Sequence, residues 1–393
     1  MGTVDTVEIQ GTCDAAFEPV KEAFAENFRE RQEVGASVAV SIDERMVVDF
    51  WAGLARRDTQ SPWTRDTIVN VYSASKGIAA LCAHRLVDQG RLDLDAPIAR
   101  YWPEFAQAGK SEIPVHLVLS HRAGLPAIRK PLPSDALYDW EMMTSALAAE
   151  APWWLPGSKH GYHALTFGYL VGELVRRTTG KSLGTYLREE IAGPLGIDCL
   201  IGFDAAEDSR VADIISPPPI PAEQQESFKA IFKDPESVAA KAISNPSMIL
   251  KIWSAKVANS RRWRSAEIPA GNVHTNARAF ANLYGALACG RSYRGFKVLS
   301  EESIRRCYTE QSNGPDAVNL TPTRFSMGFG LSLPDQKMGP NPRAFGHSGA
   351  GGSIGFADPD ARLGFGYAMN QMLPGNLIDV RAAALIEALY GCL

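Results

Sequence analysis

Apolar residues near the N-terminus recur first with helical spacing and then with strand spacing. Four of them, three or four residues apart, share one face of a helix expected over about 15–31: Phe17, Val20, Phe24 and Phe28. Two β-branched and apolar runs follow at 37–42 and 46–51, with a polar turn between them. This pattern is typical of a β-hairpin, so the chain is expected to open with a helix and two strands.

The last seventy residues repeat this strand-rich character. Short apolar or alternating runs predict strands, and an alanine-rich stretch predicts a closing helix; the runs are 324–333, 343–347, 353–357 and 363–369, and the helix covers about 377–390. Because both ends of the chain are rich in strands and each also carries a helix, we expect them to form two halves of one sheet.

The middle of the chain is helix-like, with long irregular connections. One of them, 216–221, contains four prolines and is incompatible with a helix or a central strand. We therefore predict an α+β fold with two parts. One is an antiparallel sheet flanked by helices, built from 1–90 and 291–393, and the other is an inserted, mostly helical domain over 91–290.

Composition and charge narrow the function. The 393 residues carry a formal net charge of −4 and no Lys/Arg-rich block, which argues against nucleic-acid or anionic-membrane partners. The six cysteines form no C-x-x-C pair, and no run of 18 apolar residues occurs. With no basic, apolar leader at the N-terminus, we expect a cytoplasmic protein with reduced thiols; association between copies stays open.

The only Ser-x-x-Lys sequence is Ser73-Ala74-Ser75-Lys76, where a strand-like run over 67–71 gives way to a helix. In the first turn of a helix, residues three apart share a face, so Lys76 would lie beside the Ser73 hydroxyl. The free N–H groups and the helix dipole there would favour an alkoxide. A serine needs such help to act as a nucleophile, although four residues alone also fit an ordinary helix cap.

Two further segments carry candidate chemistry. Tyr162 follows the turn 156–161 and precedes a helix that starts near Leu165, so its hydroxyl could face a cleft. The segment 345–352 ends a short strand in small residues, which lets a substrate approach the backbone closely and suits an oxyanion hole. Buried core tyrosines and ordinary glycine turns are the alternatives.

In this order, the three elements resemble the serine β-lactamase and penicillin-binding-protein superfamily, and specifically the class C β-lactamase-like branch that includes the family VIII carboxylesterases. The resemblance covers nearly the whole chain. It is supported by 119–126, 179–182, 194–197 and 350–356.

The resemblance implies that Ser73 is the nucleophile and that Lys76 and Tyr162 handle protons. It also implies an oxyanion hole formed by the N–H groups of Ser73 and Ala350. A cationic Lys76 would lower the pKa of Tyr162 toward neutrality, and a deprotonated Tyr162 could then accept the Ser73 proton. Water would deacylate Ser73, with no cofactor or metal.

Two departures from the lactamase pattern indicate the substrate class. Tyr162-His163-Ala164 stands where lactamases have Y-x-N, so the amide that contacts a β-lactam side chain is missing. The substrate-binding strand reads His347-Ser348-Gly349 instead of K-T-G, which replaces a fixed cation with a mostly neutral imidazole. A β-lactam carboxylate would be held less firmly, so simple carboxylic esters are the better prediction.

Other motifs are interpreted as structural. Gly351-Gly352-Ser353-Ile354-Gly355 matches G-x-S-x-G, but no histidine follows it to complete a triad, so Ser353 is expected to be structural. Gly180-Lys181-Ser182 lacks the first glycine of a P-loop, because Val175 occupies that position. His160 and His163 have no carboxylate or cysteine nearby in the sequence, so no metal is implied.

The sequence therefore predicts a serine esterase that hydrolyses short-to-medium-chain carboxylic esters through an acyl-enzyme on Ser73, with weak β-lactam cleavage as an additional expectation. Its partner would be a small-molecule ester. Alternatives within the enzymes are an acyltransferase and a β-lactamase or D,D-peptidase. A catalytically idle sensor of an acyl ligand is the alternative from another class, although Ser73, Lys76 and Tyr162 are all present.

Overall fold

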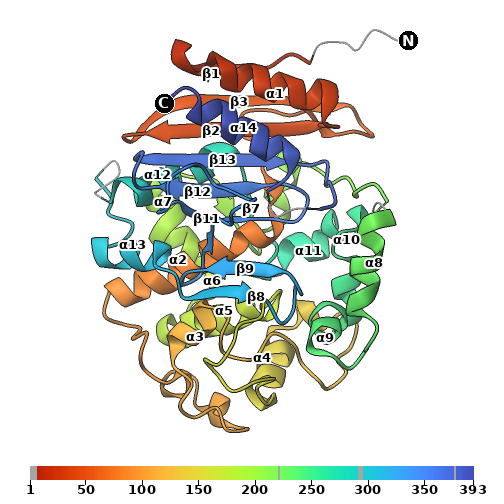
Figure 1. Cartoon of the computed structure of the whole chain (residues 1–393), viewed down its shortest axis with the longest axis vertical. Coiled ribbons are helices and arrows are strands. Elements are labelled where there is room, and N and C mark those ends of the chain that lie inside the picture. The colour runs from red at the N-terminus through yellow and green to blue at the C-terminus, as the bar shows by residue number, and fades with distance from the viewer. Residues whose placement is uncertain (1–6, 220–221, 291–294, 376–377) are drawn as a thin grey trace.

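The two ends of the chain meet in one antiparallel sheet. The computed structural model describes residues 7–219, 222–290, 295–375 and 378–393 (Figure 1). Strand β2 (Gly35–Ile42) pairs along its length with β13 (Leu363–Met369). This pairing confirms that the apolar runs near both termini form one sheet.

Within the described residues the sheet has ten strands, nine of them in the order β1-β3-β2-β13-β12-β11-β10-β9-β8, with β4 paired to β3. Its other strands are β1 (Gln10–Cys13), β3 (Arg45–Arg56), β4 (Ser61–Pro62), β8 (Ser312–Pro315), β9 (Pro322–Phe325), β10 (Gly330–Leu331), β11 (Phe345–Ser348) and β12 (Ile354–Asp358). A small second sheet has the order β5-β7-β6, formed by β5 (Val69–Asn70), β7 (His274–Thr275) and β6 (Cys199–Leu200).

The single strand predicted over 324–333 is wrong. A turn divides this stretch into β9 and β10, because Gly328 adopts a φ of +94° and the Ser326 N–H donates to the Phe329 carbonyl. The glycine makes this left-handed conformation accessible.

Some helices pack on the large sheet, and the others lie in a region below it in Figure 1. The helices are α1 (Glu18–Glu30), α2 (Ser75–Asp88), α3 (Val115–Leu119), α4 (Trp140–Ala149), α5 (Thr166–Thr179), α6 (Leu183–Leu187), α7 (Gly193–Leu195), α8 (Ala222–Ile231), α9 (Val238–Ser244), α10 (Ala255–Ala258), α11 (Arg261–Ser265), α12 (Ala277–Cys289), α13 (Glu301–Tyr308) and α14 (Val380–Tyr390).

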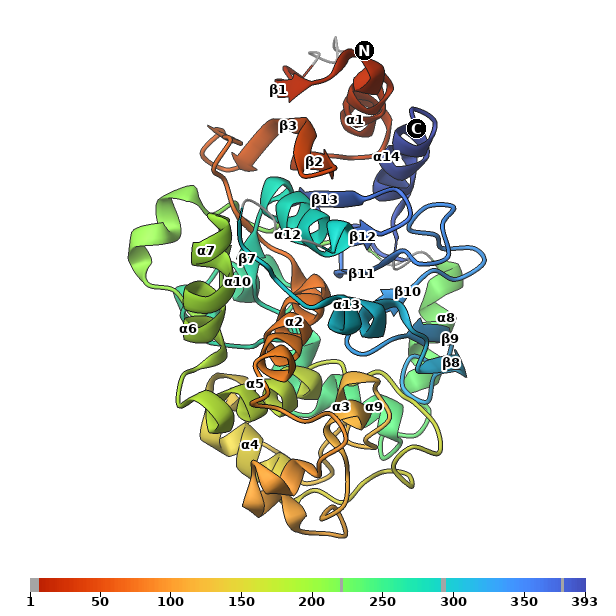
Figure 2. The ribbon, with the colours of Figure 1, turned by 90° about the vertical axis from the view of Figure 1, so that its left-hand side faces the viewer.

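Helices α1 and α14 lie together on one face of the large sheet, and α12 lies on the other (Figure 2). The predicted N-terminal helix is confirmed, with a short 3-10 turn over Ala15–Phe17 before it. The closing helix starts later than predicted: Asp379 caps α14 by accepting from two backbone N–H groups, while residue 377 lies outside the described residues. The proline-rich stretch likewise extends beyond them at 220–221.

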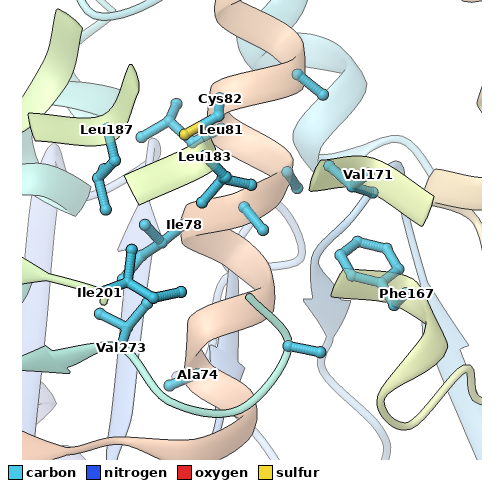
Figure 3. Close-up of a cluster of buried hydrophobic side chains, with 14 of the residues drawn as sticks. Ala74, Ile78, Leu81, Cys82, Phe167, Val171, Leu183, Leu187, Ile201 and Val273 are labelled. Carbon is cyan, nitrogen blue, oxygen red and sulfur yellow. The ribbon is translucent and has the colours of Figure 1, made fainter. Parts of the chain in front are cut away.

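Helix α2 runs through the largest apolar core and is almost completely buried. Side chains of α5 and α6 pack around it, including Phe167, Val171, Leu183 and Leu187 (Figure 3). A helix buried all round is held by packing on every side. The division into 1–90 with 291–393 and 91–290 stays a prediction, and α12, at the end of the middle range, packs on the large sheet.

Candidate active site

Ser73 lies just before the N-terminus of the buried helix α2. Strand β5 leads into a 3-10 turn, Tyr72–Ala74, which continues directly into α2. The turn is anchored from Val273, whose carbonyl accepts from the Val71 N–H at 3.0 Å and whose N–H donates to the Ser75 hydroxyl at 3.0 Å. Lys76 Nζ lies 3.1 Å from Ser73 Oγ. The predicted shared face of Ser73 and Lys76 is therefore confirmed.

The amine of Lys76 is buried deeply. Its side chain is fully inaccessible, and its Nζ donates to the Ala270 carbonyl at 3.0 Å. Burial holds the pKa of Lys76 well below its usual value, since desolvation disfavours the ammonium. A neutral amine has a lone pair with which it can accept a proton. The Ala270 carbonyl was not predicted, because nothing in the sequence relates a residue 194 positions away to Lys76.

Tyr162 completes this group. Its backbone N–H donates to Asp316 Oδ1 at 3.0 Å, and interaction with the Ser73 side chain acts to lower the pKa of its hydroxyl. Lys76 Nζ lies 4.6 Å from the centre of the phenol ring. The structure thus brings together the three predicted catalytic residues, and Asp316 was not foreseen as their support.

The predicted charge state of Tyr162 is wrong. Burial raises the pKa of Tyr162 above its usual value, so the phenol keeps its proton. The expected lowering required a cationic Lys76, but burial favours the neutral form of both groups. The directions of these two pKa shifts favour an amine that can accept a proton and a phenol that can donate one.

The glycine-rich segment after β11 touches the turn that carries Ser73. A Cβ on Gly349 would lie 2.0 Å from the Val71 carbonyl oxygen, so only glycine allows this approach. The Gly352 N–H donates to the Gly349 carbonyl at 3.1 Å and closes a turn with Ala350 and Gly351 at its centre. Among the described residues, none accepts a hydrogen bond from the Ala350 N–H. The part of the Ala350 N–H in an oxyanion hole stays a prediction.

His347 faces Tyr162 from β11, with ring centres 6.2 Å apart. Its Nδ1 lies 2.7 Å from the Ser348 carbonyl oxygen and must carry the proton, because a carbonyl only accepts. Among the residues that the structure describes, none is a hydrogen-bond partner of its buried Nε2. Burial lowers the pKa of His347 to about 3, so the predicted neutral imidazole is confirmed.

A pocket adjoins Tyr162, His347 and Ser348 on the side of β9 to β11. Its volume is about 550 Å³, open space at the mouth included. Apolar side chains contribute much of its wall: Phe325, Leu331, Leu333, Met338, Ile354 and Ile378. Such a wall suits an uncharged organic group.

The side chains of Ser353, His160 and His163 make ordinary structural contacts. Ser353 is fully buried, and its Oγ accepts from the Met369 N–H at 3.4 Å. His160 Nε2 bonds Thr323 Oγ1 at 3.0 Å, while His163 bonds two backbone groups, through Nδ1 to Gly161 and through Nε2 to Leu125. In the described part of the chain, no three His, Cys, Asp or Glu side chains are grouped to hold a metal ion. No helix there has the length and apolar character needed to cross a membrane.

Solved structures of known proteins share this architecture. A family VIII carboxylesterase is 42% identical, with a TM-score of 0.87 over 98% of this chain and 100% of its own. A penicillin-binding protein homologue from Caulobacter crescentus is 39% identical, with a TM-score of 0.88 over 98% of this chain and 100% of its own.

Sequence comparison agrees with the structural match. The esterase/beta-lactamase LipL of Mycobacterium tuberculosis is 38% identical over 92% of this chain and 83% of its own length. The family model described as Beta-lactamase matches residues 20–389. This chain belongs to the beta-lactamase family.

Proposed function

We propose that this protein hydrolyses uncharged carboxylic esters of short to medium acyl chain through an acyl-enzyme on Ser73. At the coarser level it is a serine carboxylic ester hydrolase, as its esterase relatives are. The observation that carries the finer proposal is the 3.1 Å approach of a buried Lys76 amine to Ser73 Oγ, with the Tyr162 ring centre 4.6 Å from the same amine. The free thiols of all six cysteines support a cytoplasmic location.

Neutral Lys76 acts as the base in this proposal. As Ser73 Oγ forms a bond to the ester carbonyl carbon, its proton passes to Lys76 Nζ and the carbonyl electron pair moves onto oxygen. The oxyanion accepts hydrogen bonds from the N–H groups of Ser73 and Ala350. Each such donor contributes about 10²–10³ in rate in other enzymes.

Tyr162 acts as the acid. When the tetrahedral intermediate collapses, the bond to the leaving alcohol breaks and the departing alkoxide takes the phenol proton. The Lys76 ammonium then returns a proton to Tyr162. Water then attacks the acyl carbonyl carbon and loses a proton to Lys76. When the second tetrahedral intermediate collapses, the bond from this carbon to Ser73 Oγ breaks, and Oγ takes the proton back from the Lys76 ammonium. A phenol with a raised pKa suits this donor role.

The substrate class follows from His347 and the pocket. A neutral imidazole offers no charge to a carboxylate. The neighbouring wall is largely apolar, and its cationic residue, Arg324, is already paired with Glu310. Uncharged esters therefore bind without leaving an unpaired charge. Weak β-lactam hydrolysis is a second candidate activity, favoured by the resemblance to LipL, a protein named as both esterase and beta-lactamase.

Removal of the serine hydroxyl tests the proposal. We expect Ser73→Ala to lower the turnover of p-nitrophenyl butyrate by about 10³-fold or more, because the covalent path is lost. The wild-type protein should cleave this ester readily and a chromogenic cephalosporin only slowly.

Ser353→Ala is the matched control, since it removes the hydroxyl of the buried G-x-S-x-G serine and should retain activity in folded protein. Esterase activity that survives in Ser73→Ala would overturn the assignment of the nucleophile. A cephalosporin that is the better substrate would overturn the proposed substrate class.

A further inference from the structure

A buried arginine donates a hydrogen bond to the turn that carries the Ala350 N–H. Arg381, in the first turn of α14, is fully buried, and its Nη2 donates to the Gly351 carbonyl at 2.7 Å. Gly351 has a φ of +93° and occupies the third position of the turn 349–352, where a type II turn needs a left-handed residue. The guanidinium therefore holds the peptide unit between Gly351 and Gly352, two units after the one that carries the proposed oxyanion donor.

Hydrogen bonds on all sides fix the orientation of the Arg381 guanidinium. Its five N–H donors match five contacts: Nε and Nη2 to Asp379 Oδ2 at 2.9 and 2.6 Å, Nη1 to Glu33 Oε1 at 3.0 Å and the Gln371 carbonyl at 2.9 Å, and Nη2 to Gly351. A planar group held on all sides fixes the position of each acceptor. The Gly351 carbonyl is one of these fixed points.

The glycine at 352 makes this grip possible. A Cβ there would lie 2.2 Å from Asp379 Oδ2 and 2.9 Å from Arg381 Nη2. Any other residue would push the ion pair away from the turn. Gly351 and Gly352 therefore pack directly against the ion pair of Arg381 and Asp379, although about thirty residues separate them in the sequence.

We propose that Arg381 is a positioning residue for the oxyanion hole. It holds the turn 349–352 so that the Ala350 N–H points to the developing oxyanion at Ser73. This inference rests on the proposed function, since it assumes that Ser73 is the nucleophile. The donor acts only while its direction is fixed, because an oxyanion hole works by preorganisation.

A purely structural role for Arg381 would have a different consequence. It would reduce the amount of folded enzyme, and every substrate would then lose activity by the same factor. Loss of oxyanion positioning instead penalises only substrates that depend on hydrogen bonds to the carbonyl oxygen. A thiono ester, with sulfur in place of that oxygen, accepts hydrogen bonds weakly and depends on them less.

The test compares p-nitrophenyl butyrate with its thiono analogue in wild-type protein and in Arg381→Lys. Lysine keeps the charge but lacks the fork that reaches Gly351 and Asp379 together. We expect kcat/KM for the oxygen ester to fall by about 10²-fold and that for the thiono ester by less than about threefold. Equal losses for both esters would overturn the proposal.

Asp379→Asn provides a second variant if Arg381→Lys does not fold. It keeps the oxygen that caps α14 and weakens the contact that orients the guanidinium. The ratio of kcat/KM for the oxygen ester to kcat/KM for the thiono ester, which we call the oxygen-to-sulfur preference, should fall here too. An unchanged preference in folded protein would contradict the proposal.

Tyr390→Phe is the matched control. It removes a partly buried hydroxyl contact of the same helix, to Asp358, outside the turn 349–352. It should keep the wild-type preference. Ser73→Ala distinguishes failure of the proposed function from failure of the role of Arg381. Esterase activity that persists in Ser73→Ala overturns the proposed function. An unchanged oxygen-to-sulfur preference in the Arg381 and Asp379 variants overturns only the role of Arg381.

Discussion

At the scale of single residues, burial sets the protonation states of the site. Lys76, Tyr162 and His347 lie close together, yet the structure favours the uncharged form of each. An isolated buried charge would be costly, and neutral groups avoid that cost while remaining able to exchange protons. The same burial makes Lys76 a destabilising element of the fold.

Replacement of Lys76 by the apolar Met should separate activity from stability. We expect Lys76→Met to lower esterase turnover by about 10³-fold, because no base remains beside Ser73. As pH falls below the usual lysine pKa, the unfolded wild-type chain gains a proton that the folded chain does not accept until its own lower pKa. Wild-type stability therefore falls relative to Lys76→Met as pH decreases.

Urea unfolding of both proteins at pH 10 and pH 7 measures this effect. The free-energy difference in favour of Lys76→Met should widen at pH 7. The exposed Lys256→Met controls for the loss of one charge. A difference that stays constant between the two pH values would show that Lys76 is charged in the folded protein.

At the scale of elements, α12 approaches the large sheet through glycines. A Cβ on Gly364 of β13 would lie 2.1 Å from the Gly285 nitrogen and 2.3 Å from the Ala281 carbonyl oxygen. Ser41 of β2 also donates to the Ala281 carbonyl, at 2.8 Å. Close packing of this kind leaves no room for an added methyl group.

Gly364→Ala should therefore destabilise the protein by about 1–3 kcal/mol or more, because helix and sheet must separate. Gly330→Ala, also on a strand of the large sheet, is the control, since its nearest contact would be 3.5 Å away. Thermal unfolding should show a large loss for Gly364→Ala and a small one for Gly330→Ala. Similar losses would mean that α12 can shift to accept the methyl group.

Sequence patterns predicted the elements that bury apolar residues and missed those that do not. The runs that became β2 and β13 are mostly apolar and were found, whereas β1 consists of mostly exposed residues, Gln10–Cys13, and carries no apolar pattern. Strand β10 has only two residues, too few to show alternation.

The site divides in the same way. Ser73 and Lys76 were predicted together because three residues along a helix fix their proximity. Ala270, Asp316 and Arg381 were not predicted, since each reaches the site through tertiary structure. Their contacts span 194, 154 and 30 positions respectively. The raised pKa of Tyr162 likewise depends on burial, which only the packed structure reveals.

At the scale of the whole molecule, a buried charge network ties the two ends of the chain together. Glu33 precedes β2 near the N-terminus, and it contacts Arg381 of the last helix, 348 positions away. The Tyr367 hydroxyl of β13 donates to the same carboxylate. One network therefore connects the N-terminal segment, the sheet, the last helix and the turn 349–352 beside Ser73. Such a buried network is favourable only while its members stay paired.

The pH dependence of stability should report on this network. Burial raises the pKa of Glu33 from 4.5 to about 6, despite the opposing effect of Arg381. The folded protein thus holds the Glu33 proton more tightly than the unfolded chain does. Its contribution to stability is present at pH values below 4.5 and is lost as pH rises through 6. A shift of this size corresponds to about 2 kcal/mol.

Glu33→Gln cannot titrate and should lack this dependence. Between about pH 4.5 and pH 7, we expect the wild-type protein to lose about 2 kcal/mol of stability relative to Glu33→Gln, as measured by urea unfolding across this range. Glu30→Gln, at the exposed end of α1, removes a carboxylate outside the network and should follow the wild-type curve. Parallel curves for wild type and Glu33→Gln would mean that Arg381 compensates fully for burial, so that the two ends of the chain are joined by an ion pair whose strength does not change with pH.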